Sequence, residues 1–153
     1  MRVALLDDYQ DVFKTLKNFP RLKDHEVVTF SEPERDMDRL VAKIQDCDAV
    51  MLTQQRTWFP RSLIERLPNL KLICQTGGTQ HIDLEACTER GIVVSAGGGP
   101  RVAGAPNDTA AIAWSLILSS YRHIPQEVHA LKTGGWQTTL GTALYGKTLG
   151  IYA

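Results

Sequence analysis

The sequence has few of the features that assign a protein to a specialised class. Its 17 Lys and Arg residues are balanced by 17 Asp and Glu residues, so the composition gives no basic face for nucleic acid or an anionic membrane. No apolar run is long enough to span a bilayer. The N-terminus reaches Asp7 and Asp8 too early for a signal peptide. We therefore expect a cytoplasmic protein that binds neither nucleic acid nor membrane.

Cysteines are few as well, and recognisable catalytic motifs are lacking. Cys47, Cys74 and Cys87 are odd in number and widely spaced, which argues against a disulfide framework and against a zinc site. Reduced cysteines are typical of cytosolic proteins. The spacing supports no Ser-His-Asp or Cys-His arrangement and no phosphate-binding P-loop. We expect no metal site in this chain.

Short apolar runs alternate with helical patterns up to Val94. The predicted strands cover residues 2–6, 25–30, 49–52, 70–74 and 92–94. Residues 95–99 are too glycine-rich to continue the last strand. This alternation predicts an α/β fold with a doubly wound parallel sheet, and we choose the flavodoxin-like strand order 2-1-3-4-5.

Four of the connecting segments carry helix signals. A capping aspartate or an opening proline stands before each, namely Asp8, Asp36 or Asp38, Pro60 and Asp83. The apolar faces of the first three would be formed by Val12, Phe13 and Leu16, by Met37, Leu40, Val41 and Ile44, and by Leu63, Ile64 and Leu67 before Pro68. The last helix would run to Arg90 and stop at Gly91.

Asp7 and Asp8 form a pair at the end of the first strand. Paired aspartates at such a place can bind a metal ion or phosphate-bound magnesium. Capping and solvation are the preferred roles here, because no third carboxylate lies nearby in the sequence.

The best candidate for ligand binding is the glycine loop after the fourth strand. In open α/β sheets, ligands bind beyond the carboxyl ends of the strands. Gly77 and Gly78 lie at such an end, where they allow close backbone approach and where free N–H groups can hold an anion. Considered alone, the loop is better explained as a plain strand-to-helix turn. The chosen strand order nevertheless brings it near the loops that contain Asp7 and Gln54.

Residues 76–86, followed by residues 90–94, resemble the D-isomer-specific 2-hydroxyacid dehydrogenases, the group that includes D-3-phosphoglycerate dehydrogenases. The family pattern is a Gly-x-Gly-x-Asp-x-Ile-Asp loop, a helix, and then Gly-Ile-x-Val-x-Asn. This chain has Thr76 in place of the first glycine, Gln80 in place of the Asp, and Ala96 near the usual Asn. The resemblance implies the same flavodoxin-like fold.

The resemblance also implies that the loop after the third strand helps to hold the substrate. Its Arg-Ser-x-Thr-like segment aligns the family Arg with Gln54 and the family Thr with Thr57, while Arg56 is displaced. A substrate contact and a solvated loop are equally good interpretations of this segment. The resulting set of predicted substrate-binding residues is Gln54, Gln55, Thr76, Gly77, Gly78 and Thr79, and Gly77 is also a candidate for cofactor contact.

The rest of the chain follows the family in order. We expect a substrate-binding domain over residues 1–98, a hinge over residues 99–106, and linker helices with the first strand of an NAD-binding domain over residues 107–153. The long helix from Thr109 is apolar nearly all round and is expected to be buried. Pro125 would end or interrupt it before a second helix. Two later segments also resemble the family: Gly134-Gly135-Trp136, and Gly146 to Ile151 as the first coenzyme-domain strand.

By family resemblance, the reaction is hydride transfer between NAD or NADP and a small 2-hydroxy or 2-keto acid. The family's catalytic Arg, Glu and His lie beyond Ala153, and none of His25, His81, His123 and His129 matches them. A capping or surface role is expected for His81. We therefore expect the front part of a longer enzyme, inactive alone and without bound coenzyme. A stand-alone flavodoxin-like binding module without catalysis is the alternative.

Association is the remaining expectation. The helix from Thr109 carries apolar residues around its whole circumference, and the family covers this helix with the coenzyme domain and a partner subunit. Exposed apolar patches usually mark an interface. We expect a homodimer through residues 107–152, in which a domain swap at the hinge is one possible arrangement.

Overall fold

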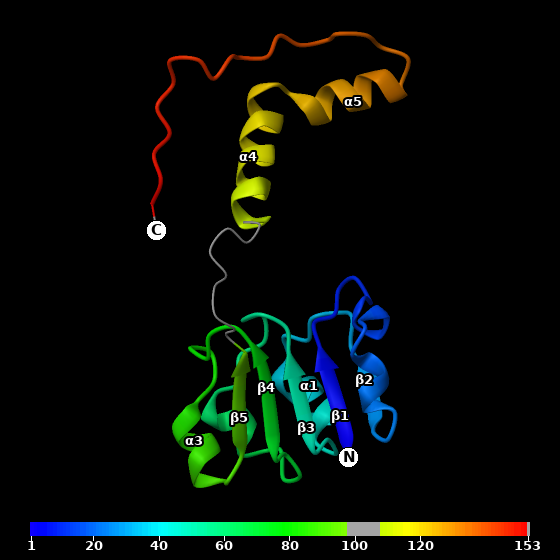
Figure 1. Ribbon diagram of the computed structural model, residues 1–153, viewed down its shortest axis with the longest axis vertical. Helices are drawn as coiled ribbons and strands as arrows, with labels where there is room; N and C mark the ends of the chain where they lie inside the picture. Colours follow the sequence, from blue (N-terminus) through cyan, green and yellow to red (C-terminus); the bar gives the residue numbers. More distant parts are fainter. Residues whose placement is uncertain (98–107, 153) are drawn as a thin grey trace. The chain divides into compact units, whose positions relative to one another are not determined.

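The computed structural model describes residues 1–97 and 108–152. The chain divides into two units, Met1–Pro100 and Arg101–Ala153. In the first unit, five parallel strands form one sheet in the order β2-β1-β3-β4-β5 (Figure 1). The strands are β1 (Arg2–Leu6), β2 (Glu26–Thr29), β3 (Ala49–Leu52), β4 (Leu72–Thr76) and β5 (Val93–Gly97). The predicted fold class and strand order are confirmed.

The core of the first unit lies around the central strands. Parallel strands covered on both faces need apolar side chains on both faces, and Ala4, Val50 and Ile73 are each fully buried. Three helices complete this unit: α1 (Met37–Ile44), α2 (Arg61–Ile64) and α3 (Leu84–Glu89). One cluster joins strands and helices, and its members include Leu6, Leu52, Leu40, Val41, Ile44, Leu63, Ile64, Ala86 and Cys87.

The predicted helix caps are confirmed at two positions. The Asp36 carboxylate accepts the Arg39 N–H at 2.9 Å, and the Asp83 carboxylate accepts the Ala86 N–H at 2.8 Å. Gly91 follows α3 with a φ of 67°, a left-handed conformation that glycine adopts without strain. The helix after Pro60 is shorter than expected, because α2 ends at Ile64.

The first predicted helix is wrong. The Asp8 carboxylate accepts the N–H groups of Val12 and Phe13, as a cap would, but only two 3-10 turns follow, Phe13–Thr15 and Phe19–Leu22. Val12 and Leu16 are each 47% exposed, so no buried face stabilises a longer helix here.

The fifth strand extends further than the sequence indicates. Ser95, Ala96 and Gly97 continue β5 because they pair with Cys74, Gln75 and Thr76 of β4. Pairing with a neighbouring strand therefore overrides the low strand propensity of glycine in this segment.

The second unit contains α4 (Asp108–Tyr121) and α5 (Ile124–Lys132). The long helix is confirmed, and Pro125 lies in the first turn of α5, where its missing N–H costs nothing. The expected burial of α4 is wrong for this chain, since none of its residues is buried. None of the helices in the described residues is long and apolar enough to cross a bilayer.

The last expected strand is also not found. Gly146 to Ile151 lies in no strand, because no strand of residues 1–97 or 108–152 pairs with it, and a strand needs a partner for its backbone groups. The expected hinge, residues 99–106, falls outside the described residues.

Candidate functional site

An open cleft of about 380 Å3 lies at the carboxyl ends of β3 and β4. We name it the carboxyl-edge cleft. Its lining residues are Gln54, Gln55, Arg56, Thr76, Gly77 and Gly78. Five of the six predicted substrate-binding residues thus come together, and the sixth, Thr79, is next in the chain but not in the lining. Their role in binding stays a prediction.

Side chains of β4 fasten the two loops of the cleft to each other. The Thr76 hydroxyl accepts the Gln54 N–H at 3.0 Å. The buried Gln75 amide donates to the carbonyl oxygens of Gln54 and Thr76 at 2.7 and 2.8 Å. These bonds use the backbone of Gln54 and leave its side chain without a protein partner in the described part of the chain.

The backbone N–H groups of the glycine loop differ in availability. The Gly77 N–H donates to the Gly97 oxygen at 2.9 Å, so the expectation of a free N–H is wrong at this residue, because β5 extends to Gly97. In the described residues, the N–H groups of Gly78 and Thr79 donate to no protein acceptor. These two donors remain for an anion.

Gly78 lies under a pair of side chains. The Gln55 amide donates to the Gln80 side-chain oxygen at 2.8 Å. A Cβ atom at Gly78 would collide with that oxygen and would lie 3.0 Å from the Gln55 nitrogen. A side chain at this position would therefore displace the exposed ends of these glutamine side chains.

Arg56 is the only charged residue among the six that line the cleft. Its Nη1 donates to the Asp7 carbonyl oxygen at 2.8 Å, and its guanidinium carbon lies 4.3 Å from the centroid of the Tyr9 ring. In the described residues it forms no ion pair, so its positive charge is not neutralised. Arg56 was not among the predicted substrate-binding residues. A turn at Gln54 and Gln55, in which Gln54 has a φ of 57°, precedes Arg56, and no periodic pattern in the sequence indicates this turn.

Asp7 and Asp8 organise loops at this edge. The buried Asp7 has a φ of 62°, and its carboxylate accepts the Thr57 hydroxyl at 2.6 Å. Asp8 caps the turn that follows it. Thr57, which aligns with the family Thr, is thus bonded to Asp7 and does not line the cleft.

His81 contradicts its expected capping or surface role. It is only 3% exposed, and neither ring nitrogen has a hydrogen-bond partner in the described residues. Burial lowers the pKa of its imidazole below the usual 6.5. A short β-bridge holds the backbone around His81 against Phe59. In this bridge the Phe59 N–H donates to the His81 oxygen at 2.8 Å, and the Asp83 N–H donates to the Phe59 oxygen at 2.9 Å.

The sheet order defines a flavodoxin-like domain, and a glycine-lined cleft lies at its carboxyl edge. The profile described as D-isomer specific 2-hydroxyacid dehydrogenase, catalytic domain, matches residues 3–105. The chain belongs to this family.

Several relatives support this assignment. The chain is 37% identical over 121 residues to D-3-phosphoglycerate dehydrogenase of Methanocaldococcus jannaschii, covering 74% of this chain and 21% of that protein. It is 31% identical to glyoxylate reductase of Thermococcus kodakarensis, covering 85% and 41%. The solved structure of phosphoglycerate oxidoreductase from Vibrio cholerae O395 is 38% identical with a TM-score of 0.86, covering 97% and 47%. The chain thus spans less than half the length of these relatives.

The residues of this chain do not fit a nicotinamide dinucleotide. The sequence contains no Gly-x-Gly-x-x-Gly turn, and residues 146–151 form no strand from which such a turn could open. Hydride chemistry is therefore not assigned to them.

Proposed function

We propose that this chain supplies the substrate-binding domain of an NAD- or NADP-dependent D-2-hydroxyacid dehydrogenase. The observation that carries the proposal is the carboxyl-edge cleft, at the edge where α/β domains bind ligands. Within residues 1–97 and 108–152, the N–H groups of Gly78 and Thr79 have no protein acceptor and Arg56 has no ion pair. The coenzyme and the catalytic Arg, Glu and His would come from a coenzyme-binding domain.

In this proposal the cleft holds the carboxylate of a 2-hydroxy or 2-keto acid. The N–H groups of Gly78 and Thr79 donate to the carboxylate, and the Arg56 guanidinium offsets its charge. The side-chain amide of Gln54 is free to orient the substrate hydroxyl. Fixing the acid in this way would present its C2 atom in one orientation for hydride transfer.

Titration with D-lactate, followed by the amide signals of 15N-labelled protein, tests the cleft. We expect shifts at Gln54, Gly78 and Thr79. Gly78→Val should abolish them by excluding backbone approach, and Arg56→Gln should weaken binding by about tenfold, as loss of one charge-assisted hydrogen bond does. Arg21→Gln, an exposed arginine outside the cleft, is the matched control. Shifts that map elsewhere, or that survive in Gly78→Val, would show that the site is wrong.

The isolated chain should have no dehydrogenase activity with NADH and a panel of 2-keto acids, because its residues form no dinucleotide turn. Turnover that survives repurification would contradict this proposal.

We further propose a homodimer through residues 107–152. Its support is the apolar surface of α4, where Ile112, Trp114, Leu116, Leu118 and Tyr121 are all exposed. A swap at residues 99–106 is one form that such a dimer could take. Sedimentation at micromolar concentration should show self-association, and Trp114→Asp combined with Leu118→Asp should remove it. A wild-type monomer at these concentrations would refute the proposal.

The cysteines support a cytoplasmic location. Cys47, Cys74 and Cys87 are all free thiols, and burial raises the pKa of each. Raised pKa values keep the sulfurs protonated and unreactive. Free thiols, rather than disulfides, are typical of a reducing compartment.

A further inference from the structure

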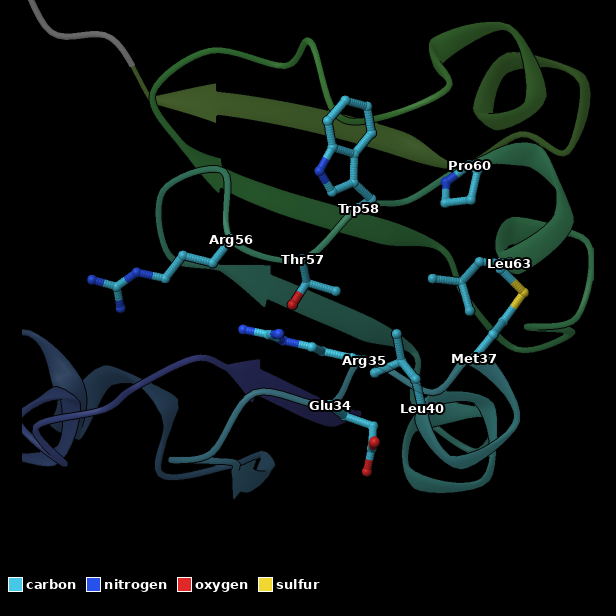
Figure 2. A pocket seen from close by; sticks show the side chains of 9 residues that line it. All are labelled: Glu34, Arg35, Met37, Leu40, Arg56, Thr57, Trp58, Pro60 and Leu63. Carbon is cyan, nitrogen blue, oxygen red and sulfur yellow. The ribbon is translucent and has the colours of Figure 1, made fainter.

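A second pocket, of about 260 Å3, lies between the loop that enters α1 and the loop that follows β3 (Figure 2). We name it the Arg35 pocket. It is lined by Glu34, Arg35, Met37, Leu40, Arg56, Thr57, Trp58, Pro60 and Leu63. Only Arg56 is shared with the carboxyl-edge cleft. Apart from Arg56, the Arg35 pocket therefore consists of residues that the proposed dehydrogenase function does not use.

The two ends of this pocket differ in chemistry. Met37, Leu40 and Leu63 gather at one end, while the side chains of Arg35 and Arg56 both extend toward the other end (Figure 2). Leu40 and Leu63 are buried and form an aliphatic floor. Trp58 also lines the pocket and is 68% exposed. Exposed tryptophan provides a large flat face for an aromatic ring.

The polar end carries the guanidinium groups of Arg35 and Arg56. The Glu34 carboxylate is bound by the Lys43 ammonium at 2.7 Å, and this contact lowers the pKa of Glu34. Asp36 caps α1, and Asp38 pairs with Arg66 at 2.8 Å. These three acids thus have partners, the Asp7 carboxylate accepts the Thr57 hydroxyl, and Arg35 forms no ion pair in the described residues.

We propose that the Arg35 pocket binds a small aryl carboxylate. The anionic group lies at the guanidinium of Arg35, and the aromatic ring lies between Trp58 and the aliphatic floor. The volume falls just below the range of about 300–1,000 Å3 that holds drug-sized ligands, which limits the occupant to a single ring with a short acidic chain. No 2-hydroxyl group is needed for recognition, so this ligand class differs from that of the carboxyl-edge cleft.

Titration with 3-phenylpropionate tests the proposal, and 3-phenylpropan-1-ol is the uncharged analogue. The chain has three tryptophans, so three indole N–H signals report binding, and Trp58→Phe assigns the one that matters. We expect the acid to shift the Trp58 indole signal and the amides of Arg35 and Met37. The alcohol should bind about tenfold more weakly or worse, because it lacks the charge-assisted contact.

Two variants separate the charge from the ring. Arg35→Gln should reduce the affinity for the acid to that of the alcohol and leave the alcohol unchanged, whereas Trp58→Ala should weaken both. Arg39→Gln on α1 removes the same charge outside the lining and should change neither. Arg35 is exposed, so its variant should fold, and far-UV circular dichroism verifies this.

Three results would overturn the proposal: equal affinity for acid and alcohol, unchanged acid binding in Arg35→Gln, or shifts confined to the carboxyl-edge cleft or to α4. Titration with D-lactate distinguishes binding at the carboxyl-edge cleft from binding at the Arg35 pocket. It should leave the Trp58 indole signal in place even where it shifts Gly78. Failure of D-lactate to bind the cleft would weigh against the proposed function and not against the Arg35 pocket.

Discussion

The two units of this chain use apolar residues in opposite ways. In the first unit, strands and helices share one buried cluster that includes Val50, Leu63 and Ile73. In the second unit, α4 is apolar around its circumference, yet Ala130 of α5 is the only buried apolar residue of the described range 108–152. Apolar composition alone does not make a core, because a helix stabilises itself by burial only where a second surface covers it.

The largest expected effect is the difference in the free energy of unfolding when one isoleucine of each unit is replaced by alanine. Ile73 in β4 is fully buried and Ile112 in α4 is 63% exposed. Ile73→Ala should lower the free energy of unfolding by about 2–5 kcal/mol, through lost burial and the cavity left behind. Ile112→Ala should change it by about 0.5 kcal/mol or less in the monomer. Urea unfolding at low protein concentration measures both.

The same pair of variants also tests whether α4 is covered in solution. If Ile112→Ala costs as much as Ile73→Ala at low concentration, the helix is packed against its own chain. If its cost rises with protein concentration, the proposed dimer covers it, because association stabilises only the folded partners.

A smaller effect is expected from His81 of the first unit. Because its side chain is buried, it should make the stability of this unit depend on pH. Burial lowers the pKa of folded His81, so in the unfolded chain the imidazole takes up its proton at a higher pH, near 6.5. The unfolded state then binds more protons between the folded pKa and 6.5, and stability rises with pH through this window. The full contribution is present above pH 6.5 and is lost as pH falls toward the folded pKa.

His81→Leu should flatten the pH dependence of stability in that window. Thermal unfolding of this variant and of the wild-type chain in buffers between pH 5 and 8, about the range over which histidines titrate, measures the difference. An unaltered slope in His81→Leu would show that this imidazole is not buried in solution.

His81 also shows where sequence reasoning succeeds and where it fails. Apolar runs predicted the strands, and Asp36 and Asp83 predicted caps, because these signals act between near neighbours. The strand order was instead chosen as the flavodoxin-like one, which the family resemblance also implied. The burial of His81 depends on a bridge between Phe59 and Ile82, which are distant in sequence. The extension of β5 to Gly97 likewise depends on its pairing with β4. Local patterns do not contain such contacts.

The candidate site divides in the same way. The glycine loop and Gln54 could be placed at one edge from the strand order alone. Two hydrogen bonds could not be predicted in this way, because each joins residues that are distant in sequence. One runs from the Gly77 N–H to the Gly97 oxygen, and the other runs from the Thr57 hydroxyl to the Asp7 carboxylate. Arg56 was not included in the predicted site, because the family's arginine aligns with Gln54, two residues earlier, whereas Arg56 lines the cleft.

The smallest expected effect concerns Glu127 of α5, which makes the main polar contact between a helix and the following segment in the second unit. Its carboxylate accepts the N–H groups of Thr138 and Thr139 at 3.1 and 2.6 Å and both hydroxyls as well. The hydroxyl and N–H groups of Thr139 and Thr138 lower the pKa of Glu127. Glu127→Gln should speed hydrogen exchange at Thr138 and Thr139 and leave exchange in β1–β5 unchanged, because these threonines and the strands belong to different compact units. Lowering the pH until Glu127 is protonated should have the same local effect. Faster exchange throughout the sheet in Glu127→Gln would show that the two units unfold together, and the contrast between them would then hold only for their packing and not for their stability.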